Sequence, residues 1–254
     1  MLRIKRLSKT FNRNTENEIK VFNNFYIDIE KNKCTAIIGP NGCGKSTLLN
    51  LIAGSTISDA GEILLNGRSI SMLREEERAI YLGRVYQNPS MGVSPNLTVL
   101  ENLSLADKKG EGFNLKRLVK KRNIEKYVAL LKELDLGLEN KLNVKVKFLS
   151  GGQRQSLSLV MATMKHPDLL LLDEHTAALD PKTSYIVMEK TQELIKKYSI
   201  TTIMISHNMR DAIKYSDKII MLDRGAVVLD SPSNEITEEE LTELYKEKLI
   251  QNVA

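Results

Sequence analysis

The sequence predicts an α/β fold: a mainly parallel sheet, with an N-terminal antiparallel β region and a helical insert. Cys34–Ile38 and Leu169–Asp173 are short, nearly continuous apolar runs, as expected of strands buried on both faces. A glycine-rich segment and a helical pattern follow the first run, and strand and helix patterns alternate again after the second. From Asn88 to about Met164 helical patterns dominate instead. Alternating strands and helices favour a parallel sheet, and the intervening stretch is typical of an insert.

The composition indicates a folded protein with a sizeable core. The chain has 254 residues, of which 42% are hydrophobic, too many for a disordered segment. The net charge of +5 suits a nucleotide ligand or an anionic membrane surface without selecting between them. Two cysteines, Cys34 and Cys43, indicate no disulfide framework and fit a reducing compartment. No apolar run approaches the roughly 20 residues of a membrane span, so we expect any membrane role to act through a partner.

Turn signals and alternation predict the remaining strands. They are expected within 1–30, at Gly61–Leu65 and Ser69–Ile70 around an Asn-Gly turn, and at 82–86, 200–206, 218–223 and 226–230. We therefore expect a single domain with three parts. These are an α/β core at 1–87 and 165–230, a helical subdomain at 88–164 and a C-terminal helical tail at 231–254.

Capping signals predict where several helices begin. Thr98 with Glu101 and Thr237 with Glu240 form capping-box patterns, and Asp180 precedes a proline at the first helical position. The stretch Asn114–Lys132 is basic and amphipathic, which we interpret as the solvated face of a helix.

The segment Gly39–Thr47 matches G-x-x-x-x-G-K-[ST], the phosphate-binding loop of P-loop NTPases. A strand pattern precedes it and a helical pattern follows, so backbone N–H groups and a helix N-terminus face one anion. Lys45 adds a charge for the β- and γ-phosphates, and the Ser46 hydroxyl is a candidate Mg²⁺ ligand. The predicted nucleotide-binding residues in this loop are Gly39, Asn41, Gly42, Cys43, Gly44, Lys45, Ser46 and Thr47. We also expect Lys45 and the helix dipole to lower the pKa of the Cys43 thiol and make it reactive.

A second glycine loop, Leu149–Gln153, also opens a helical pattern. It is a second anion site in the physical sense, although a plain N-cap followed by flexible glycines explains the same letters. Two such loops in one chain suggest a two-fold dimer, in which each phosphate loop faces the partner's second loop.

Taken in order, these motifs resemble the nucleotide-binding subunit of an ATP-binding cassette (ABC) transporter. The resemblance runs from Leu2 to about Asp230. It rests on the phosphate loop, Gln87 after a strand, the signature Leu149–Gln153, Asp173-Glu174 at a strand end, Ala178-Leu179-Asp180, and His207 after a strand. It implies the ABC ATPase fold, with ATP and Mg²⁺ bound.

The resemblance also implies roles for individual residues. Glu174 is the candidate general base for the attacking water, although a helix N-terminal charge is the alternative for this residue. Gln87 and His207 are the other catalytic candidates, through contacts to metal, water and the γ-phosphate. Asp173, Ser46 and Gln87 are implied to hold Mg²⁺. The residues implied to meet the nucleotide of the other subunit, or its interface, are Ser150, Gly151, Gly152, Gln153 and Asp180.

Three positions leave alternatives open. Phe11 lies where the family places an aromatic ring that stacks on adenine, and it could equally be a packing residue of the first strand. His175 stands where many relatives have proline, and it could tune Glu174 or act as a spacer. Cys43 lies at a loop position that tolerates several residues, and its alternative to a reactive thiol is an inert filler whose side chain points away from the nucleotide.

The resemblance implies a motor subunit that works as a homodimer at the cytoplasmic face of the membrane. Its partners would be membrane permease subunits docking near Gln87–Leu97, where Met91–Val93 offers apolar contact, and, in an uptake system, an extracytoplasmic substrate-binding protein. Import of aromatic or other hydrophobic amino acids is the favoured role. The alternatives are a soluble ABC ATPase of iron–sulfur assembly and an exporter ATPase. Nucleic acid is not expected, because no aromatic residues interleave with Lys116, Arg117, Lys120, Lys121 and Arg122.

Overall fold

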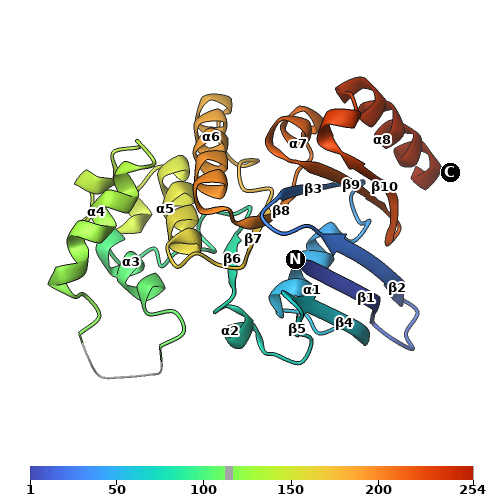
Figure 1. Cartoon of the computed structure of the whole chain (residues 1–254), viewed down its shortest axis with the longest axis horizontal. Helices are drawn as coiled ribbons and strands as arrows, with labels where there is room; N and C mark the ends of the chain where they lie inside the picture. The colour runs from blue at the N-terminus through green and yellow to red at the C-terminus, as the bar shows by residue number, and fades with distance from the viewer. Residues whose placement is uncertain (112–116, 254) are drawn as a thin grey trace. The chain divides into compact units, whose positions relative to one another are not determined.

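The computed structural model describes residues 1–111 and 117–253 of the chain (Figure 1). The chain divides into two compact units. The first unit comprises Met1–Arg78 and Ser199–Ala254, and the second comprises Ala79–Tyr198. The three-part division expected above has different boundaries and stays a prediction.

The first unit contains an antiparallel sheet with the strand order β2-β1-β4-β5. Its strands are β1 (Leu2–Phe11), β2 (Ile19–Ile29), β4 (Ala60–Leu65) and β5 (Arg68–Ser69). Leu2 and Ile4 of β1 are buried and pair with the buried Ile29 and Ile27 of β2, so alternate residues build the core face. Asn66 and Gly67 both have positive φ, 50° and 82°, as a type I′ hairpin turn requires. The predicted hairpin is therefore confirmed.

A second group of strands in this unit is mainly parallel. The strand β3 (Cys34–Ile38) pairs in parallel with β8 (Thr201–Ile205) on one side and with β9 (Lys218–Asp223) on the other. The strand β10 (Ala226–Pro232) returns antiparallel to β9. Every residue of β3 and β8 is buried, which explains why neither sequence alternates.

The helices of the first unit are α1 (Lys45–Ala53), α2 (Glu75–Arg78), α7 (Met209–Tyr215) and α8 (Glu238–Val253). Helix α8 begins at the predicted capping box, where the Glu240 carboxylate accepts from the Thr237 backbone N–H and the Thr237 hydroxyl accepts from the Glu240 N–H. Helix α7 packs beside α8 (Figure 1).

Arg78 secures the end of α1. Its guanidinium is almost fully buried and donates to the carbonyls of Leu51 and Ile52, at 2.6 and 3.0 Å, and to those of Ser71 and Leu73. Leu51 and Ile52 lie in the last turn of α1, where carbonyls lack a partner within the helix and a positive charge complements the helix dipole. Gly54 ends α1 with φ 88°, and a side chain there would crowd Arg78.

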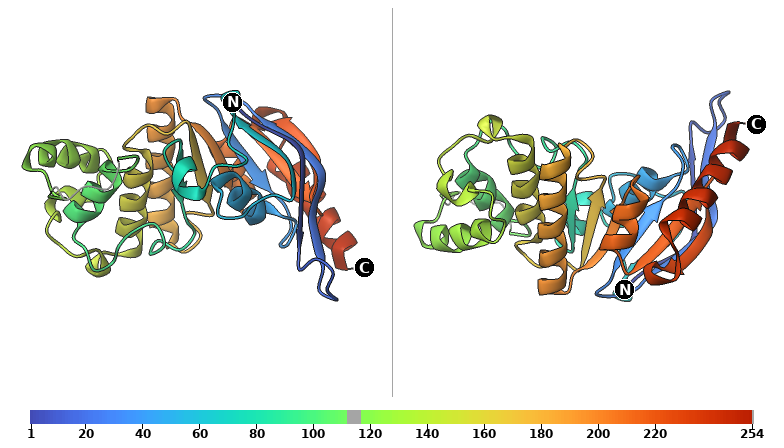
Figure 2. Two further views of the ribbon diagram at one scale, coloured as in Figure 1. Left: turned by 90° about the horizontal axis from the view of Figure 1, so that it is seen from below. Right: turned by 90° about the horizontal axis from the view of Figure 1, so that it is seen from above.

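The second unit has two parallel strands, β6 (Leu82–Val85) and β7 (Leu169–Asp173). Its helices are α3 (Val99–Asp107), α4 (Ile124–Lys132), α5 (Gly151–Thr163) and α6 (Pro181–Tyr198). Helices α5 and α6 lie side by side in both views of Figure 2. A Cβ at Gly152 of α5 would overlap the Thr183 methyl of α6, so this glycine allows the two helices to approach closely.

The predicted helix starts at Thr98 and Asp180 are confirmed. Thr98 and Glu101 form a complete capping box, and Asp180 Oδ1 accepts from the Thr183 N–H at 3.1 Å. The expected helix over Asn114–Lys132 is shorter than predicted: α4 begins at Ile124, and residues 117–120 are not helical. Its first residues, Asn114–Lys116, lie outside the described part of the chain. Among the described helices, none combines the length and the apolar composition that crossing a membrane requires.

Candidate functional site

The phosphate loop connects β3 to α1 in the first unit. Gly39 has φ 147°, and a Cβ there would overlap the Leu222 carbonyl oxygen, so this position requires glycine. Gly44 is the N-cap of α1 with φ 110°; it provides no side-chain cap, and the first turn of α1 has no acidic residue. Neither a side chain of Gly44 nor an acidic residue in the first turn therefore competes with an anionic ligand for this helix end.

Lys45 places its ammonium over this loop. The side chain is buried, with 6% of the residue exposed, and Nζ donates to the carbonyl oxygens of Gly39 at 2.7 Å and Pro40 at 3.0 Å. Ser46, the next residue, is exposed at the start of α1. The loop thus combines a buried cation, a helix N-terminus and an accessible hydroxyl, a donor set that suits nucleotide phosphates.

The expectation of a reactive Cys43 thiolate is wrong. Cys43 is 4% exposed, and burial raises the pKa of its thiol more than the charge of Lys45 lowers it. Cys34 is also buried, and burial raises the pKa of its thiol to about 12. The two thiols are therefore protonated near neutral pH.

Two further predicted residues belong to the first unit. Phe11 is the last residue of β1 and is half-buried, with the Lys9 ammonium 5.0 Å from its ring centroid. His207 is exposed and lies between β8 and α7, directly before Asn208, the N-cap of α7. Both assignments stay predictions.

At the end of β7, in the second unit, Asp173 lies against Arg84 of β6. Asp173 Oδ2 is 3.4 Å from Arg84 Nη2, and the two side chains are 15% and 13% exposed. The carboxylate is thus partly withdrawn from water but compensated by a neighbouring cation.

Glu174 follows with its backbone in the left-handed region, at φ 46°. This conformation costs free energy for a residue other than glycine, so the surrounding structure must hold it. Its Oε2 accepts a hydrogen bond from Gln87 Nε2 at 3.1 Å, which brings two of the predicted catalytic residues together. Helix α6 begins at Pro181, so Glu174 is not the helix N-terminal charge that was its alternative.

His175 turns away from solvent. It is 2% exposed, and its Nε2 lies 3.2 Å from the Thr191 hydroxyl of α6. Thr191 Oγ1 donates its own hydrogen to the Val187 carbonyl at 2.7 Å, so His175 Nε2 must be the donor between them. Burial lowers the pKa of His175 to about 4, and the ring is neutral near pH 7. It therefore anchors the segment after Glu174 onto α6.

The second glycine loop has an ordered cap. Ser150 is the exposed N-cap of α5, and its hydroxyl accepts from the Gln153 N–H at 3.2 Å. Gln153 Oε1 accepts in turn from the Ser150 N–H and from Lys141 Nζ, at 3.3 and 3.0 Å. The Gln153 side chain is thus engaged within the unit, whereas Ser150 faces outward. Hydrogen bonds from Thr183 hold the pKa of the exposed Asp180 below its ordinary value.

The family model described as ABC transporter matches residues 22–177 of the chain, which is more than half of its length. The chain belongs to the ABC transporter family. A tyrosine transport ATP-binding protein of Clostridioides difficile is 47% identical over 251 residues, covering 97% of this chain and 99% of that protein. A probable branched-chain amino acid transport ATP-binding protein of Archaeoglobus fulgidus is 34% identical, covering 84% of this chain and 86% of its own length.

A solved ABC cassette has the same fold. It is a dimeric, post-hydrolysis state of an ATP-binding cassette bound to ADP and phosphate, 28% identical, with a TM-score of 0.78, covering 92% of this chain and 99% of that one. The ABC ATPase fold expected from the motifs is confirmed, and so is the activity: this cassette hydrolyses ATP in the service of transport.

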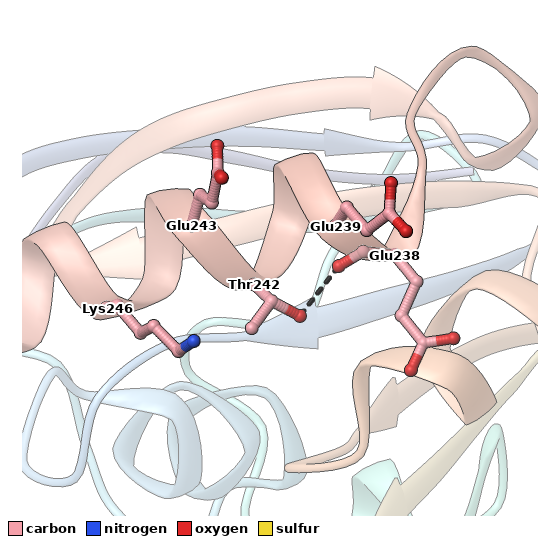
Figure 3. Close-up of a pocket in the computed structure, with 5 residues that line it drawn as sticks. All are labelled: Glu238, Glu239, Thr242, Glu243 and Lys246. Atoms are coloured by element: carbon pink, nitrogen blue, oxygen red, sulfur yellow. Dashed lines mark hydrogen bonds between the residues drawn. The ribbon is translucent and has the colours of Figure 1, made fainter.

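A surface pocket along α8 of the cassette does not suit the nucleotide. Glu238, Glu239, Thr242, Glu243 and Lys246 line it, and the Thr242 hydroxyl donates to the Glu238 carbonyl (Figure 3). Its three carboxylates repel phosphate, and none of the predicted site residues lines it.

Sequence reasoning missed two residues beside the predicted catalytic ones. Arg84 lies within the strand before Gln87, and its signal is a charged side chain among buried neighbours, Leu82 and Val85. Thr191, the partner of His175, lies in the middle of α6 and has no sequence signal at all, because the contact joins residues sixteen positions apart.

Proposed function

We propose that this ABC cassette is the ATP-hydrolysing subunit of an amino-acid uptake system. The match to the tyrosine transport protein, 47% identical over nearly the full length of both chains, carries this proposal. Two copies bind two ATP molecules head to tail and drive separate membrane permease subunits from the cytoplasmic face, with an extracytoplasmic binding protein delivering the solute. The 1–87 and 165–230 segments form the core, and 88–164 and 231–254 form the helical subdomain and tail.

The first unit binds the phosphates. Lys45 releases the Gly39 and Pro40 carbonyls and turns its charge to the β- and γ-phosphates, while the N–H groups of the loop donate to phosphate oxygens. Phe11 stacks on adenine, and His207 donates to the γ-phosphate. Across the dimer, the exposed Ser150 of α5, with Gly151 and Gly152, meets the nucleotide held by the partner.

The residues assigned to Mg²⁺ fit that ion. Ser46, Gln87 and Asp173 offer a hydroxyl, an amide and a carboxylate, the oxygen ligands that Mg²⁺ takes. Mg²⁺ commonly keeps several waters and takes substrate phosphates beside one or two protein ligands, and the bound ion would neutralise charge developing on the phosphates.

Hydrolysis depends on Glu174. Its carboxylate accepts a proton from the attacking water, and Gln87, already hydrogen-bonded to it, orients that water and the carboxylate. The buried anchor of His175, the next residue, helps to hold the strained backbone of Glu174 and so keeps the base in place.

The permease contact is expected near Gln87–Leu97. Met91 is 65% exposed there, whereas Val93 is buried, so Met91 is the apolar side chain that this segment offers to a coupling helix.

Glu174→Gln tests the proposal. The variant should bind Mg-ATP, lose hydrolysis by about 10²- to 10⁴-fold, and accumulate as an ATP-bound dimer in light scattering. In cells that depend on this cassette, the same substitution should abolish uptake of radiolabelled tyrosine or a branched-chain amino acid and leave glucose uptake unchanged. Near-normal hydrolysis would remove the base assignment. Lost hydrolysis with unchanged uptake of every amino acid tested would remove the substrate class alone.

A further inference from the structure

Arg84 is a largely buried cation beside the carboxylate assigned to the metal. It lies on β6 opposite Leu171 of the parallel strand β7, so its side chain and that of Asp173 meet where the two strands end. The contact is 3.4 Å long, involves one carboxylate oxygen, and joins side chains that are 13% and 15% exposed. At this burial the guanidinium compensates a charge that water reaches poorly.

Arg84 also has a second partner. Its guanidinium carbon lies 4.5 Å from the centroid of the Tyr86 ring. The buried Gln155 of α5 donates to the Tyr86 carbonyl at 3.0 Å, which fixes this end of β6. A guanidinium on an aromatic face keeps a favourable contact when a neighbouring carboxylate turns elsewhere. Arg84 can therefore give up Asp173 without becoming an isolated buried charge.

A cation beside Asp173 opposes the binding of a second cation there. Without nucleotide, Mg²⁺ meets a carboxylate already neutralised by Arg84 and is repelled by the guanidinium. Mg²⁺ that arrives on ATP brings phosphate ligands and negative charge that outweigh this repulsion. We propose that Arg84 is a positioning residue that keeps Asp173 paired until Mg²⁺ arrives with the nucleotide. This proposal rests on the assignment of Asp173 as a metal ligand.

Binding of Mn²⁺ to the nucleotide-free full chain tests this proposal, with free Mn²⁺ measured by electron paramagnetic resonance. Arg84→Met should bind Mn²⁺ about tenfold more tightly than the natural protein, because the opposing charge is gone. Arg84→Lys keeps the charge and should bind as the natural protein does. Arg74→Met, which removes an arginine whose side chain is 78% exposed, is the matched control and should leave Mn²⁺ binding unchanged.

The gain must depend on Asp173. Adding Asp173→Asn to Arg84→Met should abolish the gain in Mn²⁺ affinity. If the Arg84→Met protein does not fold, Arg84→Gln is the substitute and should show the same gain. Unchanged Mn²⁺ affinity in a folded Arg84→Met or Arg84→Gln protein would overturn the proposal. If Asp173→Asn alone weakens Mg²⁺-dependent ATP binding in that case, the metal assignment stands and only the role of Arg84 fails. If Asp173→Asn leaves Mg²⁺-dependent ATP binding unchanged, the assignment of Asp173 as a metal ligand fails as well.

Discussion

Arg78 of the first unit and Arg84 of the second differ in the kind of partner that they contact. In the first unit, Arg78 donates to backbone carbonyls at the end of α1 and in the segment before α2. In the second unit, Arg84 pairs with the carboxylate of Asp173, and the exposed Gln87 donates to the carboxylate of Glu174.

The difference separates contacts that belong to the fold from contacts that a bound ligand can change. A backbone carbonyl in a helix end moves only if the helix moves, so the contacts of Arg78 are part of the fold. A carboxylate can change partner by rotating its side chain, so the contacts of Asp173 and Glu174 can exchange when nucleotide and metal bind. We expect substitutions of the first kind to cost stability, and those of the second kind to alter binding and catalysis.

Arg78→Met should give the largest loss of stability. It leaves four carbonyls without their donor, and unsatisfied buried groups cost about 1 to 3 kcal/mol each before relaxation, so we expect about 4 kcal/mol in total. Equilibrium urea unfolding measures it. Arg78→Lys, with a compact ammonium in place of the fork, should recover part of the loss. Arg74→Met removes an exposed pair with Glu77 and should change stability by about 1 kcal/mol or less. A loss as small for Arg78 as for Arg74 would contradict a structural role.

Because His175 is buried in its neutral form, we expect the folded protein to lose stability in acid. Its pKa is about 4 in the folded protein and 6.5 in the unfolded chain, so the unfolded state binds a proton first. The stability contributed by the neutral ring is complete above pH 6.5, falls between pH 6.5 and 4, and levels off below pH 4. The full change is about 3 kcal/mol. Unfolding of metal-free protein at several pH values, compared with His175→Asn, isolates it. Parallel pH profiles for the two proteins would show that His175 is not buried as described.

Thr191→Val should have a smaller effect. It removes the acceptor of the His175 hydrogen bond inside the protein, which costs about 1 to 2 kcal/mol. Thr163→Val is the matched control, because the Thr163 hydroxyl is also buried and donates to a carbonyl one helical turn back, that of Leu159. Thr163→Val loses only a hydrogen bond to the backbone of its own helix, so it should lower the free energy of unfolding less than Thr191→Val does. Equal melting temperatures would mean that the His175 contact contributes nothing.

Local chemistry made much of this molecule predictable. The phosphate loop, the Asn66-Gly67 turn and the caps at Thr98, Ser150 and Thr237 depend on residues a few positions apart, so their letters specify their geometry. Which groups Arg78, Arg84 and His175 contact depends on strand register and helix packing, and neither can be read from the sequence.

The error at Cys43 has the same origin. Its neighbour Lys45 is visible in the sequence and lowers the thiol pKa, but the burial that raises it comes from the packed loop. Which of the two effects on the thiol pKa is larger could be decided only from the burial of the thiol in the structure. The shortened helix over Asn114–Lys132 is a different case, because amphipathic spacing alone did not fix where that helix begins.

A structure of the natural cassette with Mg²⁺ and a non-hydrolysable ATP analogue tests the contrast between Arg78 and Arg84 most directly. We predict that Asp173 turns from Arg84 to the metal and its waters, that Arg84 remains on the Tyr86 ring, and that Arg78 keeps its contacts to the Leu51 and Ile52 carbonyls. A nucleotide-bound structure in which the Arg84–Asp173 contact persists at 3.4 Å, while the metal is held without Asp173, would contradict the account.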